Sequence, residues 1–191
     1  MHALPIQTMA TRNGSLKRQA GIDLIQLSVA VGIIAFILAV GFLVVPTVMT
    51  NIKVNSETSD IQQSVSNALR VFGSGADSSG LTTDVAVSLK LSPPDRISGK
   101  NILNRFGGTV DWSHGSVFGN EDGLTITSKG YSAEACAKLV PNVQALFARI
   151  KIGGTTVKDT ANGTALSVSS LGTACNPGGG KTADIEFAFT K

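Results

Sequence analysis

Four residues of catalytic type lie close together near the middle of the chain. They are Asp111, Ser113, His114 and Ser116, and they include the acid, base and nucleophile of a hydrolytic triad. Triad members normally come from separate elements and converge in space, whereas so short a run belongs to one turn and one strand edge. We therefore assign His114 and Trp112 to such an edge and expect no enzyme.

A second run imitates a phosphate-binding loop. Residues 178–182 read Gly-Gly-Gly-Lys-Thr, but the motif needs another glycine five residues before Gly180, where the chain has Cys175. The motif should also open a helix, and the residues that follow are strand-like. The one histidine outside residues 1–21 and the two distant cysteines match no zinc spacing. The sequence therefore predicts no catalytic residue, no cofactor and no metal.

The charge of the chain is concentrated at its start. Residues 1–21 contain Arg12, Lys17 and Arg18 and no acid, which accounts for the whole net charge of +3. The remainder is neutral. Nucleic-acid binding normally requires a basic face, so we expect no direct contact with nucleic acid.

The segment from Leu24 to Ile52 contains no charged residue. A helix rises about 1.5 Å per residue, and roughly 20 apolar residues cross a bilayer, so this segment is long enough to span one. Lys17 and Arg18 precede it, and Lys53 is the next charge. The positive-inside rule then keeps the N-terminus in the cytoplasm and exports the rest.

A secretory signal has a shorter apolar stretch, about 7–15 residues, followed by a small-x-small cleavage site. No such site follows this segment, so we expect it to stay in the protein. That leaves a plain signal anchor or a cleavage in front of the helix. Gly21 stands at the required place, between the basic leader and Ile22.

This arrangement resembles the class III signal of type IV pilins and related pseudopilins. The resemblance implies that a prepilin peptidase cuts between Gly21 and Ile22 and that the new N-terminus, Ile22, is methylated. It divides the chain into a leader (1–21), a transmembrane and filament-core helix (22–50) and an exported globular pilin domain (51–191).

The long leader resembles that of the type IVb branch, which includes the toxin-coregulated pilins. Asn104-Arg-Phe-Gly-Gly-Thr-Val110 and Tyr131-Ser-Ala-Glu-Ala-Cys-Ala-Lys-Leu139 are similar to stretches of the PilS secretory pilins. Such a family implies a bacterial inner-membrane stage and then an extracellular pilus, a helical homopolymer of the chain itself. Its other implied partners are the prepilin peptidase, the assembly platform and an ATPase.

One residue departs from the family pattern. The fifth residue after the cleavage glycine is usually glutamate, thought to pair with a neighbour's N-terminal amine during assembly, and here it is Gln26. Glutamine keeps a hydrogen bond but supplies no charge. Asp23 is a candidate substitute. The departure keeps open a minor pilin or a type II secretion pseudopilin.

The two cysteines, Cys136 and Cys175, both follow the apolar segment. In an exported domain they are expected to form a disulfide. Two buried free thiols are the alternative.

The rest of the chain predicts an α+β fold with one long helix on an antiparallel sheet. We expect the helix over residues 24–72, with an apolar stripe of Ile61, Val65, Ala68, Leu69 and Phe72 and an end at Gly73–Gly75. A loop (73–100) with a short helix near Thr82–Leu91 should follow.

Ser132 is expected to cap a helix carrying Cys136, and Pro141 to end it or to begin a second one reaching Ile150. Cys175 is assigned to a late loop. The expected strands are Gly108–Trp112, Leu124–Ser128, Thr155–Lys158, Ala165–Ser169 and Asp184–Thr190.

Two classes of function fit these features. The first is a filament subunit, and the second is a signal-anchored periplasmic enzyme or binding domain. The second leaves the position of Gly21 and the basic leader without an explanation.

Overall fold

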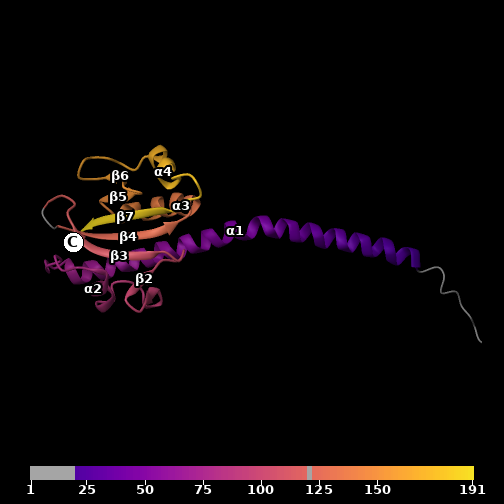
Figure 1. Ribbon diagram of the computed structural model, residues 1–191, viewed down its shortest axis with the longest axis horizontal. Helices are drawn as coiled ribbons and strands as arrows, with labels where there is room; N and C mark the ends of the chain where they lie inside the picture. Colours follow the sequence, from indigo (N-terminus) through magenta and orange to yellow (C-terminus); the bar gives the residue numbers. More distant parts are fainter. Residues whose placement is uncertain (1–19, 120–121) are drawn as a thin grey trace, which may run out of the picture. The chain divides into compact units, whose positions relative to one another are not determined.

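The computed structural model describes residues 20–119 and 122–191, with the side chains of residues 20–23, 43 and 44 outside the description. The chain divides into two units, of which the first ends at Pro46 and the second covers Thr47–Lys191. Each unit is described by itself below (Figure 1).

The first long element is helix α1, Ala20–Phe72, with Pro46 inside it. It begins four residues before the expected start at residue 24. Asp23 falls in its first turn, where the helix dipole favours an acid. The end is as predicted, because Gly73 N donates to Leu69 O at 2.8 Å and Gly75 takes a φ of 88°.

The prediction of the apolar stripe is wrong at one residue. Ile61, Val65, Ala68 and Phe72 are buried, whereas Leu69 is 40% exposed. The buried residues recur at steps of three and four, which keeps them on one face of a helix. Leu69 follows Ala68 by one residue and so lies about 100° around the helix.

The second unit contains an antiparallel sheet in the order β1-β2-β3-β4-β7-β5-β6. The last strand in the chain therefore lies inside the sheet. In chain order, the strands are β1 (Ile97–Ser98), β2 (Asn101–Leu103), β3 (Thr109–Gly115), β4 (Gly123–Tyr131), β5 (Arg149–Ile152), β6 (Thr155–Asp159) and β7 (Ala183–Thr190).

Shorter helical elements connect the strands. They are α2 (Thr83–Ser88), η1 (Pro94–Arg96), α3 (Ala133–Val143), η2 (Gln144–Leu146) and α4 (Val168–Cys175). Ser132 caps α3 as predicted, since Ala135 N donates to its Oγ at 3.2 Å. The expected loop over residues 73–100 also contains η1 and β1.

Three expected elements differ from the structure. The helix α3 runs past Pro141 to Val143, and in place of a second helix to Ile150 there is the short η2 followed by strand β5. The expected strand Ala165–Ser169 overlaps the start of α4, which places Cys175 in a helix rather than a loop.

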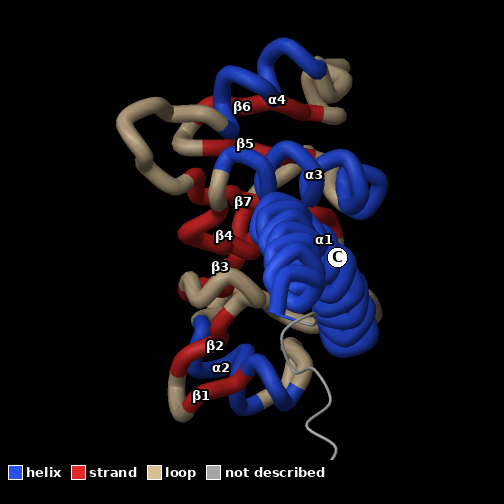
Figure 2. Tube along the Cα trace, turned by 90° about the vertical axis from the view of Figure 1, so that its right-hand side faces the viewer, coloured by secondary structure: helices blue, strands red, loops and turns tan. Residues whose placement is uncertain are grey.

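The core of the second unit lies between the sheet and the helices α1 and α3, which lie on the same side of it (Figure 2). On β7, Ile185, Phe187 and Phe189 are buried as the alternation predicted. Phe147 stacks on Phe187 with ring centroids 4.6 Å apart. These residues anchor the middle of the sheet to the helical layer.

Candidate functional site

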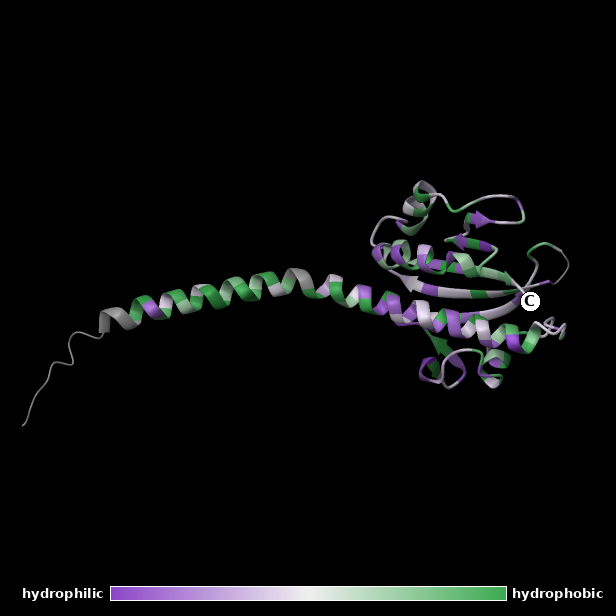
Figure 3. Ribbon diagram, turned by 180° about the vertical axis from the view of Figure 1, so that it is seen from behind, coloured by the Kyte–Doolittle hydropathy of each residue, from purple (hydrophilic) through white to green (hydrophobic). Residues whose placement is uncertain are grey.

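In the first unit, α1 presents an almost entirely apolar surface, coloured as hydrophobic in Figure 3. The exposed fraction of its large side chains runs from 45% at Val40 to 79% at Phe42. By length and composition this helix can cross a membrane. Its exposed apolar residues are Leu24, Ile25, Leu27, Val29, Val31, Ile33, Ile34, Phe36, Ile37, Leu38, Val40, Phe42 and Val45.

Gln26 is exposed on this apolar surface, so its amide can reach a group outside the chain. The other predicted processing and assembly residues are Gly21, Ile22 and Asp23. Their backbone is helical, and their side chains lie outside the described residues.

The apolar surface continues a short way into the second unit and then changes character. Ile52 is still 55% exposed. Lys138 Nζ donates to Asn51 Oδ1 and to Glu134 Oε1, both at 2.7 Å, and Lys53 Nζ lies 5.8 Å from the ring centre of Phe106. From these residues onward α1 makes polar contacts with the globular domain.

A buried acid joins α1 to the sheet. Glu57 is 3% exposed, and its two carboxylate oxygens accept hydrogen bonds from the Tyr131 hydroxyl at 2.8 Å and from Arg105 N at 2.7 Å. Burial raises the pKa of Glu57, while these two hydrogen bonds act in the opposite direction. Burial also raises the pKa of Tyr131 well above its usual range. Glu57 is therefore a buried junction between helix and sheet.

Asn104 organises the turn that faces this acid. Its Oδ1 accepts from Phe106 N and Gly108 N, both at 2.9 Å, and its Nδ2 donates to Ser128 Oγ at 3.0 Å and Lys129 O at 2.7 Å. Ser128 Oγ in turn lies 2.7 Å from the Tyr131 hydroxyl. One amide thus closes the turn and connects it to the Glu57 junction.

The glycines of the same turn have separate roles. Gly107 takes a φ of 87°, a conformation in which L side chains are strained. A Cβ on Gly108 would lie 1.8 Å from Lys129 O. The Asn-Arg-Phe-Gly-Gly run therefore encodes a tight turn pressed against β4.

Beside the junction, an ion-pair chain ties α1 to the turn and to η1. Arg105 contacts both carboxylate oxygens of Asp60, with Nε at 2.6 Å and an Nη at 2.9 Å. The same guanidinium lies 3.1 Å from Asp95, which pairs with Arg96 at 3.2 Å. Because Asp60 is largely buried and held at two points, this pair restrains the helix more than an exposed pair would.

The predicted disulfide is confirmed. Cys136, on α3, is bonded to Cys175 at the end of α4, with Cα atoms 5.6 Å apart. Both are buried. The bridge attaches α4 to the helix that lies beside α1.

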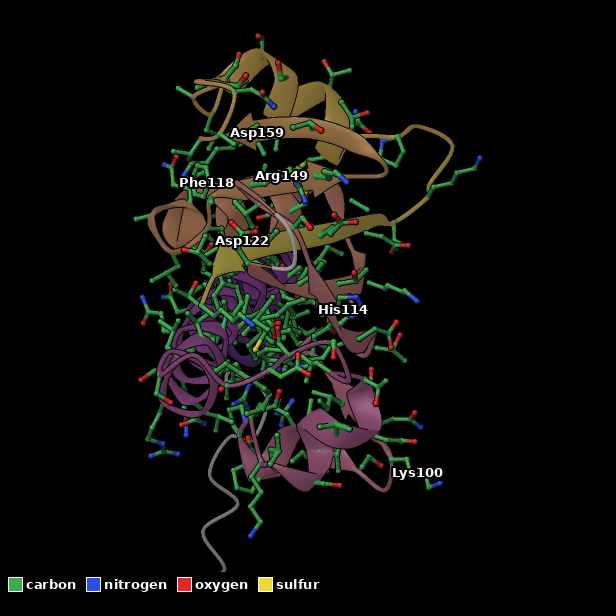
Figure 4. All side chains as sticks on the ribbon, turned by 90° about the vertical axis from the view of Figure 1, so that its left-hand side faces the viewer. Lys100, His114, Phe118, Asp122, Arg149 and Asp159 are labelled. Atoms are coloured by element: carbon green, nitrogen blue, oxygen red, sulfur yellow. A yellow bond between two sulfur atoms is a disulfide. The ribbon has the colours of Figure 1, made fainter. Side chains whose placement is uncertain are left out.

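The triad-like residues share one strand and its end. Asp111 pairs with Lys129 at 2.8 Å, and His114 is exposed on β3 (Figure 4). At Trp112 the strand β3 pairs with β4 alone, because β2 pairs only with Thr109 and Val110, so the expected strand edge is present here. The Trp112 side chain is nevertheless buried, at 2% exposed. These side chains form no triad, and Gly178–Gly180 lies in the loop before β7.

The sequence reasoning missed Glu57. Its position was informative, because Glu57 falls three residues after Val54 and four before Ile61, on the buried stripe of α1. An acid at such a position requires partners in the fold. Tyr131 and Arg105, which provide them, belong to the two motifs singled out above.

This chain is similar to known proteins both in sequence pattern and in fold. A family model described as PilS N terminal matches residues 43–188. A comparison with curated proteins gave no match.

Two solved structures are similar to this chain. The crystal structure of a type IV b pilin from Salmonella typhi is 18% identical, with a TM-score of 0.56, and the match covers 72% of this chain and 99% of that one. TcpA, a type IV pilin from Vibrio cholerae El Tor, is 16% identical, with a TM-score of 0.48 and coverage of 71% and 99%. The Salmonella match shows a common fold.

Proposed function

The chain belongs to the PilS family of type IVb pilins, and from this premise we propose that it is the structural subunit of a type IVb pilus filament. The members of this family are structural subunits, so the chain is a pilin and not an enzyme. Family membership thereby removes the alternative of a signal-anchored enzyme.

The observation that carries the proposal is the exposed apolar surface of α1 up to Ile52. Such a surface is far larger than the patches that soluble monomers expose, and it requires a cover. In our proposal lipid of the bacterial inner membrane covers it first, and the same helices of neighbouring subunits cover it in the extracellular pilus. The partner in the filament is thus the chain itself.

The maturation steps rest on the resemblance of the leader. We propose cleavage between Gly21 and Ile22 by a prepilin peptidase, followed by methylation of Ile22. Residues 22–50 would then be the membrane and filament-core helix, and residues 51–191 the exported domain. The assembly platform and its ATPase complete the proposed partners, and the neutral mature chain argues against direct contact with nucleic acid.

A minor pilin or a type II secretion pseudopilin is the second candidate. It is favoured by Gln26, where the family pattern has an acid, since an amide cannot attract a neighbour's amine by charge. The two candidates differ in abundance. A major subunit forms most of the filament mass, and a minor subunit or pseudopilin is a trace component.

The test is a comparison of surface filaments from cells producing Gly21→Arg and, as a control in the leader, Gly14→Arg. We expect filaments containing this chain from the parent and the control, and unprocessed chain without filaments from Gly21→Arg. Filaments made equally well by Gly21→Arg would overturn the proposed processing. A trace amount of the chain in the parent filaments would select the second candidate.

The role proposed for Asp23 is tested separately by Asp23→Asn, alone and with Gln26→Glu. Because Asp23 is the only acid before Glu57, its loss should reduce filament yield at a normal membrane pool, and Gln26→Glu should partly restore the yield. If Asp23→Asn assembles like the parent, Asp23 has no part in recruitment.

A further inference from the structure

A small cavity lies between α1, the segment around η1 and the strands β2, β3 and β4. Its volume is about 20 Å³. A water molecule needs about 10–15 Å³ of such space, so the cavity has room for one water and for no larger ligand. The polar residues of its lining include Glu57, Asp60, Ser64, Asn104, Trp112 and Ser128.

Trp112 lines this cavity and carries a hydrogen-bond donor that no group of the described residues satisfies. The residue is 2% exposed, and among the described residues its Nε1 has no hydrogen-bond partner. Its backbone N donates to Thr83 Oγ1 at 3.0 Å, and its ring packs edge-on against Phe189 at 6.5 Å. The ring is therefore held in place and cannot turn toward an acceptor in the protein. Another group must accept the hydrogen bond of Nε1.

The other polar groups of the lining are able to complete the coordination of a water. Each carboxylate oxygen of Glu57 accepts one hydrogen bond and retains acceptor capacity. Ser64 Oγ donates to Asp60 O at 2.7 Å, which leaves its lone pairs available. A water there has one donor to accept from and several oxygens to donate to, within the two to four partners that buried waters normally make.

We infer that this cavity is a binding site for one ordered water, which accepts a hydrogen bond from Trp112 Nε1 and donates to the oxygens of the α1 side. A metal ion suits the site less well, because Asp60 is already paired with Arg105 at 2.6 Å and Arg96 lines the same cavity. The water therefore bridges helix α1 and strand β3 at this point. It also supplies the Glu57 carboxylate with solvation that the protein alone does not give.

Trp112 is the only tryptophan of the chain, so its indole N–H gives a single signal in the NMR spectrum of the indole-¹⁵N-labelled full chain in detergent micelles. We expect a cross-peak between this proton and water. Its sign should be opposite in the NOE and ROE spectra, which indicates a long-lived bound water. We also expect slow exchange of the proton. A missing cross-peak, or one with the signature of rapid exchange with bulk solvent, would overturn the inference.

A pair of variants locates the water. Val110→Ile adds a methylene group to a residue that lines the cavity and should abolish the cross-peak. Val117→Ile makes the same change at a buried valine outside it and should preserve the cross-peak. The dispersion of the backbone amide signals in a second sample, labelled uniformly with ¹⁵N, verifies that each variant is folded. A cross-peak that survives Val110→Ile in a folded protein would show that the water lies elsewhere.

Discussion

The Tyr131 hydroxyl donates a hydrogen bond of 2.8 Å to Glu57 Oε1, joining strand β4 to helix α1 across 74 residues of sequence. Both side chains are buried. The bond connects the globular domain to the same helix that carries the exposed apolar surface. Glu57 and its partners thus add to the attachment that the buried stripe of α1 and the Asp60–Arg105 pair also provide.

Tyr131→Phe tests this attachment. The change leaves Glu57 Oε1 and Ser128 Oγ without the hydroxyl, and a buried group that loses its partner costs about 1–3 kcal/mol. The thermal unfolding midpoint of the full chain in detergent should therefore fall. Gln62→Ala, at an exposed position of α1, is the control and should change stability by less than about 0.5 kcal/mol. Equal midpoints for Tyr131→Phe and the parent would mean that the bond adds no stability.

The pH dependence of stability should report on Glu57. Its pKa is raised in the folded state above the ordinary value of 4.5, so the folded chain holds this proton more tightly than the unfolded chain. The corresponding stability is fully present below pH 4.5 and is lost as the pH rises through the folded pKa.

We therefore expect the unfolding midpoint of the parent to decline across that window relative to Glu57→Gln, which cannot ionise. Melting curves of both proteins at matched pH values and constant salt provide the measurement. Parallel profiles would contradict the assignment of this pH dependence to Glu57.

Removal of the disulfide should destabilise the domain without affecting membrane insertion. Replacing Cys136 and Cys175 by serine opens a loop with a sequence separation of 39, and chain entropy predicts a loss of about 4 kcal/mol. Reduction of the parent should lower its melting temperature similarly, and reduction of the double variant should have no further effect. A double variant as stable as the oxidised parent would show that the bridge is not a stabilising element.

Gly108→Ala tests the tight turn before β3. The added Cβ would lie 1.8 Å from Lys129 O, so β4 or the turn must move, at a cost of about 1–3 kcal/mol. The matched control is Gly80→Ala, where a Cβ meets nothing within 4 Å and stability should stay within about 0.5 kcal/mol of the parent. Similar melting temperatures for the two variants would show that the turn can relax freely.

Elements with strong local signals were predictable from the sequence. The end of α1 is marked by Gly73 and Gly75, and the cap of α3 by Ser132. The alternation of apolar residues identified β7, and the position of both cysteines after the apolar segment predicted their disulfide. Each of these signals lies within a few residues of the feature it marks, apart from the cysteine pair.

Strand β5 and helix α4 depended on distant partners. Arg149–Ile152 is a strand because it pairs with both β6 and β7, and a segment of four residues carries too little pattern to indicate this. The alternation of apolar and polar residues over Ala165–Ser169 favours a strand locally. Their helix is attached to α3 through Cys175, a tertiary constraint that outweighs propensity.

The candidate site was predictable only in part, because one of its features is local in sequence and the other joins distant segments. The apolar surface of α1 is continuous in sequence, so its extent was evident from composition. The Glu57 junction combines a helix, a turn and a strand, and Arg105 lies 48 residues from Glu57. The motif containing Arg105 was recognised, but its partner on α1 was not.

The central claim is that this chain is cleaved after Gly21 and built into a filament with its apolar helix intact. The most direct test is the intact mass of the subunit in purified surface filaments. We expect the mass of a chain that begins at Ile22, with one added methyl group and two hydrogens fewer for the Cys136–Cys175 bond. A mass that includes residues before Ile22, or that begins after Met49, would contradict it.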